Sequence, residues 1–133
     1  RLRDYLELMA VRMGPRLRYT LDLPDALRQV PVPPLLLQPL VENAIKHGLE
    51  PKAEGGRLTV SAEVVHGKLA VTVADTGLGF GKAATAGTGV GLANIRERLQ
   101  LLYGPKASLT ITENPGGGTR VTLAVPYKPL EGA

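Results

Sequence analysis

The stretch LQPLVENAIKHG, residues 37–48, separates into an apolar and a polar helical face, and the prediction of the fold starts from it. At about 100° per residue, its aliphatic side chains fall on one side of a helix. Its polar side chains fall on the other side, namely Glu42, Asn43, Lys46 and His47. The pattern predicts a helix over residues 35–48, with an irregularity or kink at Pro39, which lacks the backbone N–H.

Outward from this helix, the sequence predicts two further helices and a set of short strands. Apolar residues recur at helical spacing over residues 1–13 and 92–102, and a Gly-Pro pair ends each run. Alternation of apolar and polar residues predicts strands at residues 17–23, 58–64, 69–73, 109–111 and 121–125. Residues 75–91 are rich in Gly, Ala and Thr, which predicts a mobile loop.

These elements indicate an α+β fold. Strand pairs with one polar face need helices to cover the opposite, apolar face. We therefore predict one domain over residues 1–133, a two-layer sandwich whose mixed, mostly antiparallel sheet carries its helices on one face. The chain begins at Arg1 within a predicted helix, so we expect it to be a fragment of a longer protein.

The composition excludes several classes of function. The chain has no cysteine, which rules out disulfides and thiolate metal sites. No apolar run approaches the ~20 residues of a membrane-spanning helix. The net charge of +4 is compatible with an anionic ligand. However, aromatic residues make up only 4% and no basic run occurs, which disfavours a nucleic-acid-binding module.

The polar face of the residue 35–48 helix is the first candidate site. Asn43, Lys46 and His47 share one helical face by their spacing. An amide oxygen can coordinate Mg²⁺, and a lysine can contact a phosphate as a point charge. Glu42 borders the same arc and could act as a general base. Taken alone, the pattern is more typical of a solvated polar helix face, the usual state of an amphipathic helix.

Three glycine-containing motifs follow in the chain. DTGLGF, residues 75–80, places a carboxylate at a strand end, where it can accept a hydrogen bond from the exocyclic amine of adenine. GTGVGL, residues 87–92, precedes a predicted helix whose free N–H groups suit phosphate. GGGT, residues 116–119, ends in Thr119, which could hold a water or the base edge beside Asp75. Each of these motifs alone is typical of an ordinary turn.

Two arginines of the predicted helix that follows GTGVGL are further candidates. Arg96 and Arg98 could reach the phosphates or lie on the surface.

In combination and in this order, the four motifs are similar to the N box and the three G boxes of the GHKL ATPase superfamily. LQPLVENAIKHG, together with NIRERL at residues 94–99 and LYG at residues 102–104, resembles more specifically the LytS-like sensor histidine kinases. The resemblance extends from about Tyr5 to Tyr127 and implies a Bergerat-type sandwich that binds ATP with Mg²⁺.

The resemblance also implies a role for each motif residue. Asn43 would be the Mg²⁺ ligand, Lys46 a phosphate contact, and Glu42 the base toward an acceptor histidine. The residues that would surround the nucleoside are His47, Asp75, Gly77, Gly79 and Thr119. Those that would face the phosphates, at the end of the lid over ATP, are Gly89, Val90, Gly91 and Leu92. The stretch between Gly79 and Gly89 is short, and no separate lid phenylalanine follows Phe80.

The implied function is transfer of the ATP γ-phosphoryl group to a histidine on a neighbouring dimerisation domain, and then to a response regulator. His47 lies in the nucleotide box and His66 in a predicted turn, so the acceptor is expected upstream of Arg1. We expect a cytoplasmic domain of a homodimeric, membrane-anchored parent. The alternatives are an anti-sigma-factor-type serine kinase, an ATPase acting as a conformational clamp, and a non-catalytic nucleotide-binding or docking module.

Overall fold

The computed structural model describes residues 2–22, 34–79 and 88–127, and a mixed five-stranded sheet forms the centre of this part of the chain. The strand order is β1-β2-β3-β5-β4. β1 runs parallel to β2, and each other neighbouring pair is antiparallel. The strands are β1 (Leu17–Asp22), β2 (Gly56–Val65), β3 (Lys68–Asp75), β4 (Ser108–Glu113) and β5 (Thr119–Pro126).

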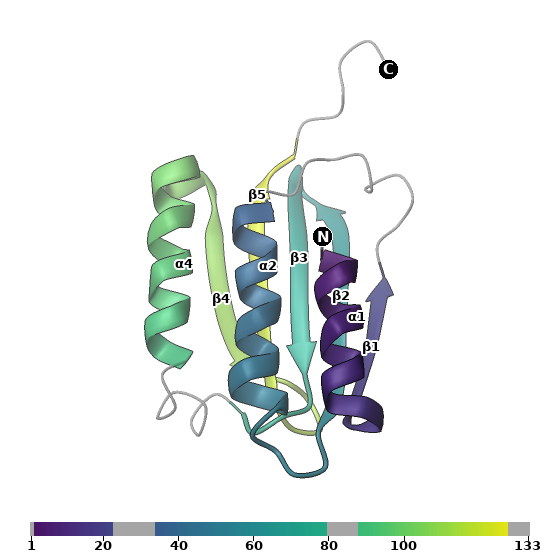
Figure 1. Cartoon of the computed structure of the whole chain (residues 1–133). Helices are drawn as coiled ribbons and strands as arrows, with labels where there is room; N and C mark the ends of the chain where they lie inside the picture. The colour runs from purple at the N-terminus through teal and green to yellow at the C-terminus, as the bar shows by residue number, and fades with distance from the viewer. Residues whose placement is uncertain (1, 23–33, 80–87, 128–133) are drawn as a thin grey trace.

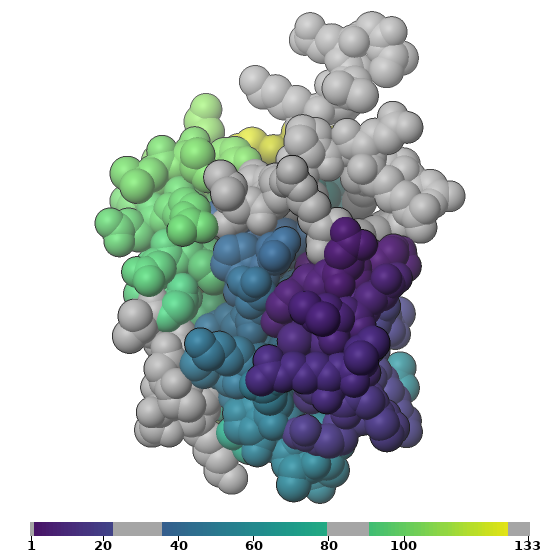
Figure 2. Space-filling view, in the orientation of Figure 1, coloured from purple at the N-terminus to yellow at the C-terminus, as the bar shows by residue number. Residues whose placement is uncertain are grey.

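Three α-helices cover one face of this sheet (Figure 1). They are α1 (Leu2–Met13), α2 (Pro34–Asn43) and α4 (Thr88–Tyr103). The 3₁₀ turns η1 (Gly14–Arg16) and η4 (Gly104–Lys106) follow α1 and α4 at the two Gly-Pro pairs. In the space-filling view, α1 and α2 lie against each other over the sheet, with α4 beside α2 (Figure 2). The predicted α+β sandwich with helices on one face is confirmed.

Two elements differ from the sequence prediction. The central helix continues past Asn43 as a π-helical segment, η3 (Ala44–Leu49), in which Glu50 N donates to Ile45 O at 2.7 Å. α4 begins at Thr88, four residues before the predicted start at Leu92. The prediction of a loop through residue 91 was therefore wrong for residues 88–91. Glycine weakens an isolated helix, but tertiary packing of α4 stabilises the helical conformation at these positions. The remainder of that prediction, residues 80–87, lies outside the described residues.

The core lies between the helices and the inner face of the sheet. Inward strand residues such as Leu58, Val71 and Leu123 pack against helix residues such as Leu36 and Leu40, and all are buried. The opposite face of the sheet has no helix over it in the described part of the chain, and small and hydroxyl side chains line it. Among them, the Oγ1 atoms of Thr72 and Thr122 lie 3.2 Å apart.

Truncation of a core leucine should show how strongly this packing stabilises the domain. Leu123 is 0% exposed in β5, so Leu123→Ala should lower the free energy of unfolding by about 2–5 kcal/mol. Leu101→Ala is the matched control: this side chain is 81% exposed, and its loss should change the same free energy by less than about 0.5 kcal/mol. Urea denaturation followed by circular dichroism measures both. Equal effects of the two substitutions would contradict the assigned core.

Candidate nucleotide-binding site

Asp75, the last residue of β3, is the most deeply buried charged side chain in the described part of the protein. Its side chain is only 3% exposed. Gly77 N donates to its Oδ1 at 2.9 Å, and the backbone N–H of Thr119 also donates to the carboxylate. Burial raises the pKa of Asp75 above its ordinary value, whereas these two hydrogen bonds and the nearby Lys52 act in the opposite direction. The carboxylate is therefore fixed in position while one side of it faces a cavity.

Glycines allow the end of η3 to reach this carboxylate. A Cβ added to Gly48 would lie 2.9 Å from Asp75 Oδ1, so no other residue fits there without a shift of its neighbour. A Cβ added to Gly77 would overlap the backbone of Gly48. Leu78 N donates to Gly48 O at 3.0 Å, which joins the turn after β3 to the helix layer. Gly79 follows with φ +90, a conformation that favours glycine.

The turn between β4 and β5 closes the other side of Asp75. Asn114 Nδ2 donates to Asp75 O at 3.1 Å, and a Cβ on Gly118 would overlap the same carbonyl. Thr119, the next residue, is buried and lines one cavity with Asp75. This cavity of about 10 Å³ also has walls of Leu40, Asn43, Ala44, His47, Gly48 and Val121. The structure thus brings Asp75, His47 and Thr119 together.

A second cavity, of about 290 Å³, lies beside the first, between the central helix and α4. Asn43 and His47 line both cavities. From α2 and η3 the second cavity also receives Pro39, Glu42 and Lys46. From α4 it receives residues at helical spacing, namely Gly91, Asn94, Ile95 and Arg98. Gln38 Nε2 donates to Glu42 Oε1 at 3.5 Å, a long contact along the same helix.

The first turn of α4 lies directly against the amide of Asn43. A Cβ added to Gly91 would lie 2.8 Å from Asn43 Oδ1. The Leu92 side chain is buried in the core, so only its backbone is available to a ligand. Gly89 and Val90 are helical, and the side chain of Val90 lies outside what the structure describes. The N-terminal end of α4, with its free N–H groups, is thereby held near Asn43.

The structure gives Arg96 and Arg98 different surroundings, which the sequence alone did not predict. Arg96 Nη2 donates to Leu109 O at 3.1 Å, so Arg96 joins α4 to β4. Arg98, two residues on, lines the cavity of Asn43 and Lys46. Sequence reasoning also missed Gly48 and Asn94. The signal for Gly48 was its position directly after the polar helix face, whereas Asn94 shows only through the i, i+3 spacing from Gly91.

The donor set limits how a metal could be held here. Within residues 2–22, 34–79 and 88–127, no group of three or more His, Cys, Asp or Glu side chains is placed to bind a metal ion. The Asn43 amide oxygen suits a hard cation such as Mg²⁺, which usually keeps several waters and binds substrate phosphates.

Within the same residue ranges, no helix is long and apolar enough to cross a membrane.

Residues 33–129 match the family described as histidine kinase-, DNA gyrase B-, and HSP90-like ATPase. The chain belongs to this family. It is 38% identical over 130 residues to the sensor histidine kinase YesM of Bacillus subtilis, and the match covers 96% of this chain and 22% of YesM. The sensor protein LytS of Oceanobacillus iheyensis is 32% identical over 140 residues, 96% of this chain and 24% of LytS. Both of these relatives are named as sensor proteins, one of them as a sensor histidine kinase, and the chain is similar to a part of each that is the size of one domain.

Solved structures share the fold. The catalytic domain of histidine kinase ThkA superposes with a TM-score of 0.69 at 16% identity, over 96% of this chain and 93% of that one. The ATP-binding domain of PrrB from Mycobacterium tuberculosis gives 0.61 at 24% identity, with the same coverages. The chain corresponds to nearly all of these isolated domains, but to less than a quarter of the length of YesM and LytS.

The raised pKa of Asp75 predicts how stability changes with pH. The folded state binds the proton more tightly than the unfolded state, whose Asp75 titrates near 3.8. The stability that Asp75 contributes is full below that pH and is lost as pH rises through the folded pKa. We expect the free energy of unfolding, relative to the non-titrating Asp75→Asn variant, to fall as the pH rises above the unfolded value of 3.8. Urea denaturation across this range measures it, and a constant or rising difference would contradict the prediction.

Proposed function

We propose that this chain binds ATP with Mg²⁺ and supports transfer of the γ-phosphoryl group to a histidine on a neighbouring helical domain. The observation that carries the proposal is the buried carboxylate of Asp75, fixed at the end of β3 beside a cavity that His47 and Thr119 also line. A carboxylate accepts a hydrogen bond from the exocyclic amine of adenine. It would repel the carbonyl that guanine has at that position, which gives adenine specificity.

The larger cavity supplies groups suited to a triphosphate. Lys46 and Arg98 bring two positive charges from opposite walls, and the first turn of α4 brings backbone N–H groups. Asn43, between the two cavities, is the residue that would hold Mg²⁺. The metal would neutralise developing charge on the phosphates. Catalysis of phosphoryl transfer rests almost entirely on such positioning and charge stabilisation, so these few groups suffice.

Glu42 is the proposed base toward the acceptor histidine. Its side chain lines the larger cavity on the same helix face as Lys46. We propose that the acceptor histidine is not one of the residues 1–133. The chain has two histidines, and the position of each argues against that role. His47 lines both nucleotide cavities, and His66 occupies the β2–β3 turn with φ 51. From the resemblance to LytS-like sensor histidine kinases, we further propose a homodimeric, membrane-anchored parent that holds this domain in the cytoplasm and passes the phosphoryl group to a response regulator.

Calorimetric titration of the purified chain with ATP, with and without Mg²⁺, tests nucleotide binding. We expect saturable binding that weakens without Mg²⁺ and weakens at least about tenfold in Asp75→Asn, because one buried polar contact would be lost. Glu113→Gln, an exposed change on β4, should bind like the wild type. Absence of binding by the folded wild type would overturn the catalytic proposal and favour a docking module.

A matched pair of arginine substitutions tests the phosphate cavity. Arg98→Gln should weaken ATP binding by about tenfold while leaving adenosine affinity unchanged, since a charge-assisted contact is lost from the phosphates alone. Arg96→Gln removes the same charge from the same helix but only the contact to Leu109 O, so it should leave both affinities unchanged. Calorimetry with ATP and adenosine measures both. Equal losses for the two variants would contradict the assignment of Arg98.

A further inference from the structure

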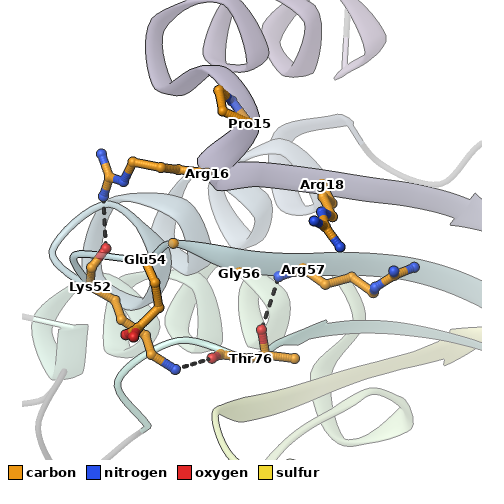
Figure 3. A pocket seen from close by; sticks show the side chains of 9 residues that line it. Pro15, Arg16, Arg18, Lys52, Glu54, Gly56, Arg57 and Thr76 are labelled. Atoms are coloured by element: carbon orange, nitrogen blue, oxygen red, sulfur yellow. Dashed lines mark hydrogen bonds between the residues drawn. The ribbon is translucent and has the colours of Figure 1, made fainter.

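A third cavity, of about 400 Å³, lies where β1 and β2 begin, and it shares no lining residue with the two nucleotide cavities. Four cationic side chains and a single carboxylate line it, which leaves a formal charge of +3. The charged residues are Arg16, Arg18, Lys52, Arg57 and Glu54 (Figure 3). The whole chain has a net charge of +4, so most of its excess positive charge is gathered at this one place.

Two of these arginines are direct neighbours on parallel strands. Arg18 of β1 is in register with Arg57 of β2, and both side chains are exposed. Neither guanidinium has a hydrogen-bond or ion-pair partner among the residues that the structure describes. Like charges directly opposite each other in a sheet are destabilising. An anion between them would relieve that repulsion and use their planar donor forks.

The remaining cations are held in place by backbone carbonyls. Arg16 donates to the carbonyl oxygens of Ala53, Glu50 and Lys52 at 2.8–3.0 Å. Lys52 Nζ donates to Thr76 O at 3.0 Å. A guanidinium has five N–H donors and an ammonium three, so both groups keep unused donors. Their charges are therefore fixed at the pocket without a carboxylate on either of them.

We propose that this pocket binds a multivalent phosphate anion. The charge of +3 suits a di- or oligophosphate better than a single carboxylate, and about 400 Å³ exceeds the space that one phosphate group needs. The oxygen atoms would lie near Arg18 and Arg57, and Lys52 and Arg16 would add positive charge to the lining of the same pocket. Glu54, the one carboxylate in the lining, would repel additional negative charge.

Thr76 connects this pocket to the nucleotide site. Arg57 N donates to Thr76 Oγ1 at 2.9 Å, and Thr76 N donates to Arg57 O at 3.1 Å (Figure 3). The residue before Thr76 is Asp75, and Lys52 lies near enough to lower the pKa of that carboxyl. An anion on Lys52 would weaken this effect. The two sites are thus separate in their residues and adjacent along β3.

Pyrophosphate titration in a Lys46→Gln background tests the proposal, because loss of Lys46 weakens phosphate binding in the nucleotide cavity. We expect one binding site in this background, and at least tenfold weaker binding when Arg18→Gln and Arg57→Gln are added. Arg120→Gln is the control, since Arg120 is an exposed arginine in β5 that does not line the pocket. The control should leave the affinity unchanged. Circular dichroism and urea denaturation verify that all variants fold.

Three results would overturn the proposal. The first is the absence of pyrophosphate binding in the folded Lys46→Gln protein. The second is binding that survives the Arg18 and Arg57 substitutions. The third is citrate binding as tightly as pyrophosphate, which would make the ligand a carboxylate rather than a phosphate. Backbone amide shifts confined to Gly56, Arg57 and Thr76 on addition of pyrophosphate would support it. ATP binding that weakens in Asp75→Asn reports on the proposed kinase site separately, because Asp75 does not line this pocket.

Discussion

Gly48 O accepts a hydrogen bond from Leu78 N at 3.0 Å, and through this contact the helix layer meets the end of the sheet. The backbone of Gly48 lies against Gly77 on one side and the Asp75 carboxylate on the other. Approach this close requires the absence of a Cβ at both glycines. His47 is the neighbour of Gly48 in the π-helical segment η3 and lines both cavities, so this contact fixes the backbone beside their shared wall. The positions of both nucleotide cavities therefore depend on this contact.

The same contact buries the Asp75 carboxylate, and the burial of its charge lowers the stability of the fold. Asp75 loses most of its hydration, and two backbone N–H groups and the positive charge of Lys52 offset only part of that loss, because the net effect on its pKa is upward. A neutral residue would fold with less penalty. A carboxylate fixed beside a cavity, with an oxygen lone pair still available, is what hydrogen-bonding recognition of an amine requires. Retention of this group under an energetic cost is the pattern expected of a binding site rather than of a structural residue.

The sequence carried the architecture because alternation and helical spacing report burial directly. These patterns identify the buried faces of strands β2, β3 and β5 and the apolar face of α2. The hydrogen-bond pattern within the helices, by contrast, could not be predicted from these local patterns. The π-helical turn over 44–49 lies against Asp75 at Gly48, and the first turn of α4 lies against Asn43 at Gly91. The separation of Arg96 from Arg98 and the pairing of Arg18 with Arg57 likewise arise from tertiary arrangement, which a single sequence does not encode as a local pattern.

The two cavities that we propose for the nucleotide, one for the base and one for the phosphates, are built from elements of different rigidity, and this difference would suit phosphoryl transfer. The base side is made of strand ends and tight turns, where Asp75 is held by Gly77, Thr119 and Asn114. The phosphate side is made of α2 and α4, two helices that contact each other across a cavity of about 290 Å³. Helices slide over one another at lower cost than paired strands, since side-chain packing adapts where a hydrogen-bond ladder cannot. A nucleotide anchored by its base could thus keep one position while α4, with Arg98, adjusts to the number of phosphates present.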